Sequence, residues 1–167
     1  FGISTQEKTI TTTGLVNCTS EMMYLHTHVI PAIDELREQI YPDGEKQFPF
    51  DLFAQNFSPI LMATWYLDDG HIVNREKNSR CRNPRAAITT AGFNPEDIVR
   101  VAQMLTDLGF ECTATKDSGI KYENARNLMF TVDGSRKLFE YISRYVPDSM
   151  RYKIPYGMEE YNALLWN

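Results

Sequence analysis

The sequence contains no apolar run long enough to cross a bilayer, although 43% of its 167 residues are hydrophobic. A membrane-spanning helix needs about 20 consecutive apolar residues, and the first residues do not have the composition of a signal peptide. The sequence therefore predicts a soluble, intracellular protein. A chain of this length can bury a core as one domain or slightly more.

Cysteine is also scarce. Its three copies, Cys18, Cys81 and Cys112, are far apart and odd in number. This pattern matches neither a disulfide framework nor the paired spacing of a zinc finger. We expect reduced thiols and no zinc site.

The chain has no net positive charge, because its formal charge at pH 7 is −5. That charge is unevenly distributed. Residues 71–90 hold five basic residues and one acid, a local charge of +4 that leaves −9 for the rest. Such asymmetry indicates a face for an anionic partner, with the remainder serving solubility. Taken alone, the basic cluster is explained equally well as a solvated loop.

Residues 58–70 form the most informative segment. Ser58 is a suitable N-cap and Pro59 a suitable first helical residue, because proline lacks an N–H group that would be unpaired there. The residues that follow are almost wholly apolar. A helix apolar on every side must be covered on every side, so we expect it to pack against a second, similar helix. Gly70 is predicted to end it in the left-handed conformation.

This helix delivers two carboxylates, Asp68 and Asp69, to its own C-terminal end. The helix macrodipole places partial negative charge there, and each anion is disfavoured by a few tenths to about 1 kcal/mol. A bound divalent metal would supply the compensating cation. The alternative is an ordinary Asp-Asp-Gly turn with solvated carboxylates.

The cap, the proline, the apolar run and the acidic terminus together resemble the LAGLIDADG homing endonucleases. The closest likeness is to the Trp-Tyr-x-Asp-Asp-Gly motif of two-motif, single-chain members, here residues 65–70. The resemblance implies an α+β fold with αββαββα order, in which four strands form a concave antiparallel sheet along the DNA major groove. The sequence agrees over residues 56–155, with expected strands at 71–76, 85–90, 110–116 and 127–132. Helices are expected at 94–109 and 135–146, the latter with Leu138, Tyr141, Ile142 and Tyr145 on its inner side.

In that fold alternate strand residues face the groove, where arginine can bind guanine through two hydrogen bonds and lysine more often meets phosphate. The resemblance makes double-stranded DNA the expected partner. The candidate contacts are Arg75, Lys77, Arg80, Arg82, Arg85, Thr89, Lys116 and Lys121.

An internal similarity bears on domain organisation. Residues 33–43 align without a gap with residues 138–148, and in both copies a lysine and a proline follow. We interpret residues 1–55 as the C-terminal part of an incomplete first repeat, with strands at 8–13 and 22–29 and a helix at 33–41. Residues 56–167 are then a complete second repeat with a C-terminal tail. A chance match of two amphipathic helices is the alternative.

The resemblance also implies roles for single residues. Lys153 matches a Tyr-Lys-x-Pro loop and Lys46, less completely, a Lys-Lys-x-x-Pro loop; such lysines stand beside active sites, where they stabilise the transition state or help to activate water. Elsewhere either would be taken as a surface lysine. Asp69, with Gly70, is expected to bind Mg²⁺. Asp68 is the weaker candidate, and His71 is expected to contact DNA or to pack.

The predicted function is site-specific, metal-assisted hydrolysis of double-stranded DNA by a homing endonuclease of an intron, intein or split gene. The chain contains one acidic helix end, whereas a two-motif enzyme needs two. We therefore expect activity when a separate N-terminal LAGLIDADG portion complements it in trans; a fragment or a decayed copy are the alternatives. An RNA-splicing maturase or a non-cleaving nucleic-acid-binding module is the alternative function. Retention of both Asp69 and Lys153 favours cutting.

Overall fold

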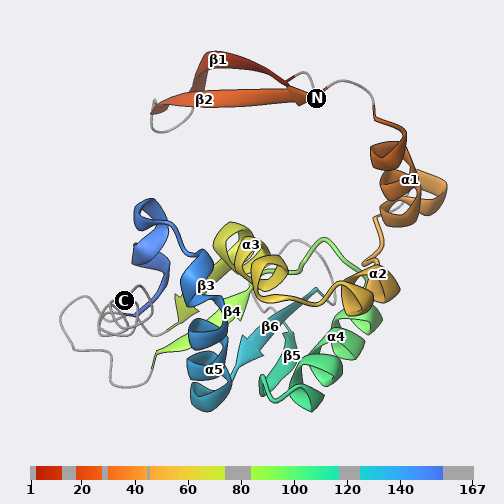
Figure 1. The fold of residues 1–167 in the computed structure, drawn as a ribbon, viewed down its shortest axis with the longest axis vertical. Coiled ribbons are helices and arrows are strands. Elements are labelled where there is room, and N and C mark those ends of the chain that lie inside the picture. Colours follow the sequence, from red (N-terminus) through yellow and green to blue (C-terminus); the bar gives the residue numbers. More distant parts are fainter. Residues whose placement is uncertain are drawn as a thin grey trace. The chain divides into compact units, whose positions relative to one another are not determined.

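The computed structural model describes residues 3–12, 18–27, 30–44, 46–73, 84–116 and 125–155, with the backbone alone for those before residue 28. The chain forms two compact units, Phe1–Asp43 and Gly44–Asn167 (Figure 1). None of the described helices has the length and apolar character needed to span a membrane.

The first unit is a hairpin followed by a helix. Strands β1 (Ile3–Thr12) and β2 (Cys18–Thr27) pair antiparallel over ten residues each. Helix α1 (Pro31–Ile40) follows and ends in a short 3₁₀ turn, η1 (Pro42–Gly44). The predicted strand pair and helix are therefore present, and both strands begin before the predicted residues. Helix α1 buries none of its side chains.

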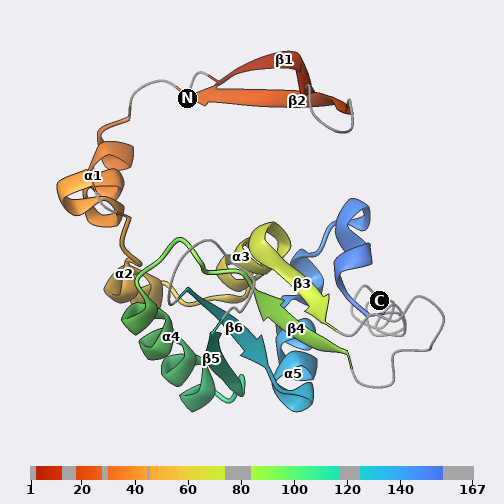
Figure 2. The ribbon, with the colours of Figure 1, turned by 180° about the vertical axis from the view of Figure 1, so that it is seen from behind.

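The second unit contains a four-stranded antiparallel sheet in the order β3-β4-β6-β5. Its larger helices, α3 to α5, lie on one side of that sheet, and Figure 2 shows the opposite side. This arrangement confirms the predicted α+β fold and its helix, two strands, helix, two strands, helix order. The elements are α2 (Phe50–Gln55), α3 (Pro59–Asp69), β3 (Gly70–Val73), β4 (Arg85–Ile88), α4 (Pro95–Asp107), β5 (Cys112–Lys116), β6 (Arg126–Phe130), α5 (Val132–Ile142), η2 (Ser143–Tyr145) and η3 (Asp148–Lys153).

Strand alternation divides the sheet into a core face and an open face. Register aligns Ile88 with Gly70 and Leu128, and these residues share the side on which the helices pack. The residues between them point the other way. The core face carries Ile72, Ala86, Ile88, Leu128, Phe130, Cys112 and Ala114, and the open face carries His71, Val73, Arg85, Ala87, Asn127, Met129, Thr113 and Thr115.

Predicted helix ends are confirmed at two helices. The Ser58 hydroxyl accepts a hydrogen bond from the Leu61 N–H group at 3.4 Å, and Pro59 is the first residue of α3. In α4 the Asn94 side chain accepts from the Glu96 N–H group at 3.0 Å. Gly109 follows α4 with φ of +85°, the left-handed region that glycine enters without steric cost.

Helix α5 differs from its prediction at both ends. It begins at Val132, before the predicted Ser135, because Thr131 caps it by accepting a hydrogen bond from the Gly134 N–H group at 3.0 Å. It ends at Ile142 and tightens into the 3₁₀ turn η2. Since a 3₁₀ turn has three residues rather than 3.6, the helical spacing fails beyond this point. Tyr145, predicted on the inner side, is 45% exposed.

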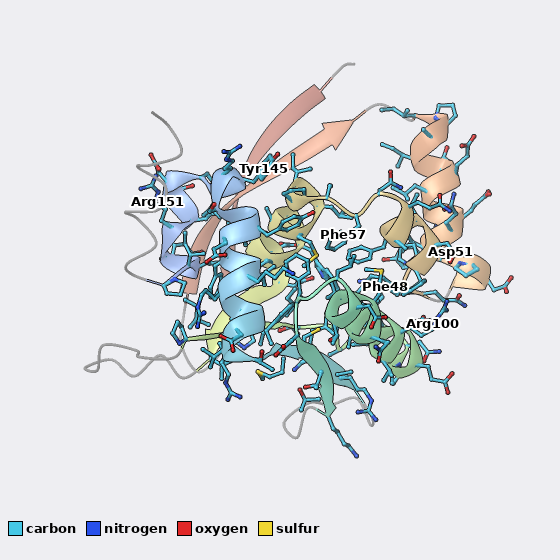
Figure 3. The ribbon with its side chains drawn as sticks, turned by 60° about the horizontal axis from the view of Figure 1, so that its bottom comes forward. Phe48, Asp51, Phe57, Arg100, Tyr145 and Arg151 are labelled. Atoms are coloured by element: carbon cyan, nitrogen blue, oxygen red, sulfur yellow. The ribbon has the colours of Figure 1, made fainter. Side chains whose placement is uncertain are left out.

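Residues 46–55 belong to the second unit and pack into it through an aromatic cluster centred on Phe48, which is labelled in Figure 3. The Phe48 ring lies 5.2 Å from that of Phe53, 5.5 Å from that of Trp65 and 5.3 Å from that of Phe93, between ring centroids. The compact units accordingly divide after Asp43, ahead of the domain boundary expected at residue 55. The assignment of residues 1–55 to an earlier repeat stays a prediction.

Candidate active site

The C-terminal end of α3 presents two exposed carboxylates, those of Asp68 and Asp69. Within the part of the chain that the structure describes, neither carboxylate forms an ion pair or a side-chain hydrogen bond. Strand β3 begins at the next residue, Gly70. The acidic end of the helix is therefore followed directly by the edge strand of the sheet, without a connecting loop.

Gly70 ends α3 for a different reason from the one predicted. Its backbone is extended, with φ of −85° and ψ of 154°, so the expected left-handed conformation is wrong. A Cβ atom at this position would lie 2.3 Å from both Cδ2 and the carbonyl oxygen of Tyr66. The chain needs glycine here because the Tyr66 ring approaches the backbone too closely for any side chain.

Lys153 reaches this end of α3 from the last turn of the described chain. Its ammonium nitrogen lies 2.6 Å from the carbonyl oxygen of Leu67 and 3.1 Å from those of Asp68 and Gly70. Its own carbonyl accepts a hydrogen bond from the Tyr66 hydroxyl at 2.8 Å. The cation that the acidic helix end was expected to need is thus supplied in part by this ammonium. The catalytic role implied for Lys153 stays a prediction.

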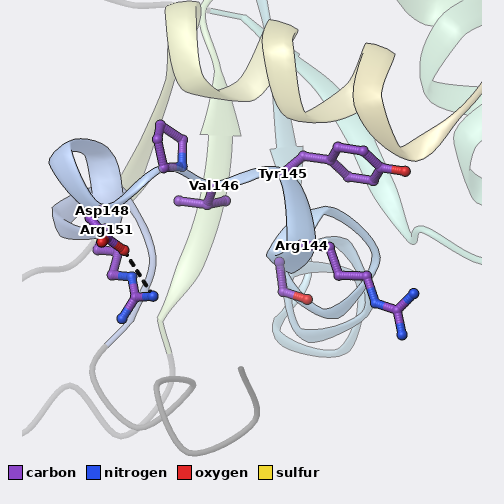
Figure 4. Close-up of a pocket in the computed structure, with 7 residues that line it drawn as sticks. Arg144, Tyr145, Val146, Asp148 and Arg151 are labelled. Atoms are coloured by element: carbon purple, nitrogen blue, oxygen red, sulfur yellow. Dashed lines mark ion pairs between the residues drawn. The ribbon is translucent and has the colours of Figure 1, made fainter. Parts of the chain in front are cut away.

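The segment between α5 and Lys153 borders an open hollow of about 600 Å³ (Figure 4). Arg151 forms an ion pair with Asp148 across 2.9 Å, and its buried Nε has no hydrogen-bond partner among the described residues. On either side of this turn, Val146 and Ile154 are buried in the core. The hollow is lined by Ser143, Arg144, Tyr145, Val146, Pro147, Asp148 and Arg151.

Lys46 occupies different surroundings. Its ammonium lies over the ring of Phe93, 4.2 Å from the centroid, and the side chain is exposed. It makes no hydrogen bond or ion pair with Asp68 or Asp69 within the described residues. Lys46 therefore makes none of the contacts that Lys153 makes with the end of α3 among the described residues. Its expected catalytic role stays a prediction.

The carboxylates at the end of α3 are suited to a Mg²⁺ ion that keeps several of its water ligands. In the described residues, no three His, Cys, Asp or Glu side chains are grouped to hold a metal ion. Mg²⁺ is commonly bound through one or two carboxylates while it keeps several waters, and Asp68 and Asp69 supply two. The Gly70 carbonyl, the other expected ligand, accepts from Lys153 but has a second lone pair.

The open face of the sheet lies beside this acidic end. Arg85 and Thr89 share its strand parity, and the Thr89 N–H group donates to the Asp69 carbonyl at 3.1 Å. Lys116 has the parity of the core-facing Cys112, at the exposed end of β5. The remaining expected contacts, Arg75, Lys77, Arg80, Arg82 and Lys121, lie outside the described residues.

Sequence reasoning overlooked most uncharged residues of the open face. Asn127, Met129, Thr113 and Thr115 stand there beside His71. Their period-two alternation with core residues is the sequence signal that could have identified them.

The sheet, its one-sided helices and the acidic helix end define the homing endonuclease fold. The chain matches the solved structure of the homing endonuclease I-WcaI bound to its DNA recognition sequence with a TM-score of 0.73 and 17% identity, over 89% of this chain and 63% of that chain. The sequence profile of the LAGLIDADG DNA endonuclease family matches residues 2–141. The chain belongs to this family, as its sequence predicted.

Curated relatives include longer proteins. RecA of Mycobacterium shimoidei is 25% identical over 129 residues, which are 75% of this chain and 30% of that protein. RecA of Mycolicibacterium chitae is 26% identical over 132 residues, with the same two shares. An uncharacterized protein of Methanocaldococcus jannaschii is 26% identical over 136 residues, 81% of this chain and 49% of the relative. The chain spans less than half of the length of each of these three relatives.

Proposed function

We propose that this chain is part of a homing endonuclease that hydrolyses double-stranded DNA at specific sites, encoded within an intron, an intein or a split gene. The observation that carries the proposal is the exposed Asp69 carboxylate at the end of α3, beside the open face of the sheet, in the turn whose backbone carbonyls the Lys153 ammonium binds. The solved homing endonuclease with this fold is bound to DNA.

The residues of this chain have separate tasks in such a reaction. Asp69, assisted by Asp68, would hold Mg²⁺ through hard carboxylate oxygens. A metal ion held there would supply positive charge that could polarise the scissile phosphate, lower the pKa of a water molecule and offset charge on the leaving oxygen. Lys153 places a positive charge on the backbone carbonyls of the acidic turn, where it offsets the negative end of the helix macrodipole.

The partner portion would pack on α3. Along this helix Ile60 is 57% exposed, Thr64 is exposed, and Leu61 and Trp65 are only half-buried. A helix of such apolar composition that leaves one face uncovered is completed by another apolar surface. A second LAGLIDADG helix, supplied in trans by an N-terminal portion, would cover this face and bring the second acidic end that cutting both strands requires.

The open face of the sheet would lie along the DNA. Arg85 and Thr89 are the described residues of this face that were expected to contact it. Arginine suits guanine or phosphate, and threonine can contact either a base edge or a thymine methyl group. The five basic residues outside the described segments are proposed to extend this contact along the backbone phosphates.

Cleavage-site selection tests the proposal. The chain would be mixed with its N-terminal complement, recognised as a neighbouring reading frame that encodes an apolar helix ending in an acidic residue and glycine, and incubated with randomised duplex DNA and Mg²⁺. We expect defined cut sites, and binding without cutting for Asp69→Asn, which keeps the side-chain shape and removes the charge. Equal cutting by Asp69→Asn would contradict the proposed role of this residue.

A non-cleaving nucleic-acid-binding module is the second candidate. It is favoured by the three carbonyl oxygens around the Lys153 ammonium, since all of its N–H donors then serve the backbone. In that case the reconstituted pair would bind selected DNA or RNA and leave it uncut at every Mg²⁺ concentration.

A further inference from the structure

The end of α3 has a complete set of backbone hydrogen bonds. A helix leaves its last four carbonyl groups without intrahelical partners. Here the Tyr66 carbonyl accepts from the Gly70 N–H group, and the Asp69 carbonyl accepts from the Thr89 N–H group at 3.1 Å. Lys153 donates to the other three carbonyls between residues 66 and 70, at 2.6, 3.1 and 3.1 Å. The acidic turn is thus bound on one side by the sheet and on the other by a single side chain.

The geometry around Lys153 limits what its ammonium can do. A lysine ammonium has three N–H donors and no acceptor, and three carbonyl oxygens lie within hydrogen-bond distance of this one. No donor is left for a phosphate or a water in this arrangement. Any influence of Lys153 on the Asp69 carboxylate therefore passes through the backbone that it binds.

Tyr66 contacts both Lys153 and Gly70. Its side chain is fully buried, and its ring packs edge-on against Phe139 with 5.6 Å between centroids. Its hydroxyl donates to the carbonyl of Lys153 at 2.8 Å. Its ring also fills the space where a Gly70 side chain would stand, since a Cβ there would lie 2.3 Å from Cδ2. One side chain consequently fixes the main chain of Lys153 and the first residue of β3.

We propose that Tyr66 is a positioning residue, which with Lys153 forms a clamp around the turn of residues 67–70 and so sets the position of the Asp69 carboxylate. Tyr66 holds the backbone of Lys153, and the Lys153 ammonium holds the carbonyls of the turn. The importance of this clamp for metal binding rests on the proposed function, whereas its effect on the turn does not.

Amide exchange in the full chain tests the clamp directly. Tyr66→Phe keeps the ring and removes the hydroxyl, and Tyr141→Phe is a matched control because Tyr141 stacks on Phe57 away from the turn. We expect exchange at the Gly70 and Thr89 amides to become about three- to tenfold faster in Tyr66→Phe, the range for loss of one hydrogen bond. Rates are referred to the Phe110 amide, which is bonded to Leu105.

Lysine variants separate geometry from charge. Lys153→Met should speed exchange at the Gly70 and Thr89 amides. Lys153→Arg should not return exchange to the rate of the unaltered chain, because a planar guanidinium cannot converge on three carbonyls as an ammonium does. Full restoration by arginine would show that charge alone matters, which would overturn the clamp. Unchanged relative exchange in Tyr66→Phe would overturn it as well, and would leave Tyr66 as an ordinary core residue.

Binding of Mn²⁺, followed by the paramagnetic resonance of the free ion, then tests positioning of Asp69. We expect Tyr66→Phe to weaken the binding that Asp69→Asn abolishes, about three- to tenfold, and Tyr141→Phe to leave it unchanged. Unaltered affinity in Tyr66→Phe would overturn the positioning role. Absence of any Asp69-dependent Mn²⁺ binding in the unaltered chain would instead contradict the proposed function, and amide exchange alone would then decide whether the clamp exists.

Discussion

The Lys46 ammonium lies 4.2 Å from the centroid of the Phe93 ring, in a cation–π contact. Lys153, which the sequence placed in a parallel role, binds three backbone carbonyls instead. Two lysines with similar sequence surroundings thus have unlike partners. Their substitution should have unlike effects.

Lys46→Met should lower the free energy of unfolding by no more than about 0.5–1 kcal/mol, the value of an exposed cation–π contact. Lys153→Met should cost more, because it leaves the carbonyls of Leu67, Asp68 and Gly70 without their donor. Urea denaturation of the two variants beside the unaltered chain measures the difference. A larger loss for Lys46→Met would show that Lys46 has contacts beyond Phe93.

Gly70→Ala should destabilise the chain by about 1–3 kcal/mol, the usual cost of forcing extra atoms into a packed site. The added methyl group would meet the Tyr66 ring and carbonyl at 2.3 Å. Gly92→Ala is the matched control, since its nearest neighbour would be the Lys46 ammonium at 3.9 Å. Gly70→Asn separates the two explanations of this glycine: asparagine tolerates the left-handed conformation, but it should be rejected here as strongly as alanine.

Asp69→Asn should raise the free energy of unfolding by a few tenths to about 1 kcal/mol while it abolishes cutting. The carboxylate stands at the unfavourable end of the helix dipole without an ion-pair partner among the described residues. Asp107→Asn is the control, because Asp107 also ends a helix but accepts a hydrogen bond from Gln103 at 2.8 Å. A destabilised Asp69→Asn variant would mean that the carboxylate has a structural role.

Stability should fall as the pH rises from about 9 to about 11, in part because of Cys112. Burial raises the pKa of this thiol from 9.0 to about 11. Over that range the unfolded chain loses the proton and the folded chain keeps it, so unfolding becomes easier by about 2–3 kcal/mol. Burial also raises the pKa of Tyr141, so the contribution of Cys112 is isolated by subtracting the pH dependence of Cys112→Ala. Identical curves for the two proteins would contradict it.

Arg85→Ala should weaken DNA binding more than Lys116→Ala. Arg85 has the strand parity of the open face, whereas Lys116 has that of the core face. If Arg85 meets a phosphate, its loss should also reduce the slope of log affinity against log salt by about 1. Fluorescence titration of duplex DNA at several salt concentrations measures both quantities. Equal losses for the two variants would show that the sheet contacts DNA through more than one face.

The sequence was sufficient where local chemistry decides the structure. Ser58 and Pro59 begin α3 as predicted, because capping depends on the few residues around it. Gly70 was correctly placed at the end of the helix for an incorrect reason, since its constraint comes from the packing of the Tyr66 ring. Tyr145 was misplaced because nothing local announces that α5 tightens into a 3₁₀ turn.

The candidate site was predictable in its residues and not in its contacts. The family resemblance predicted that Lys153 lies beside the acidic helix end. Spacing alone could not show that its ammonium binds carbonyls 83 to 86 residues earlier in the chain. The role of Tyr66 was likewise hidden, because its hydroxyl meets a residue 87 positions away. Long-range hydrogen bonds of this kind follow from tertiary packing, which single-sequence patterns do not encode.

Gly70 is both the C-cap of α3 and the first residue of β3. No loop residue therefore separates the helix from the strand. The Thr89 amide couples the same turn to the end of β4. A tilt of β3 and β4 against a bound duplex would move the Asp69 carboxylate as well, because no flexible linker lies between the strands and this residue. If the chain acts as proposed, a poorly matched DNA target would shift the Asp69 carboxylate even where no side chain contacts the mismatched base.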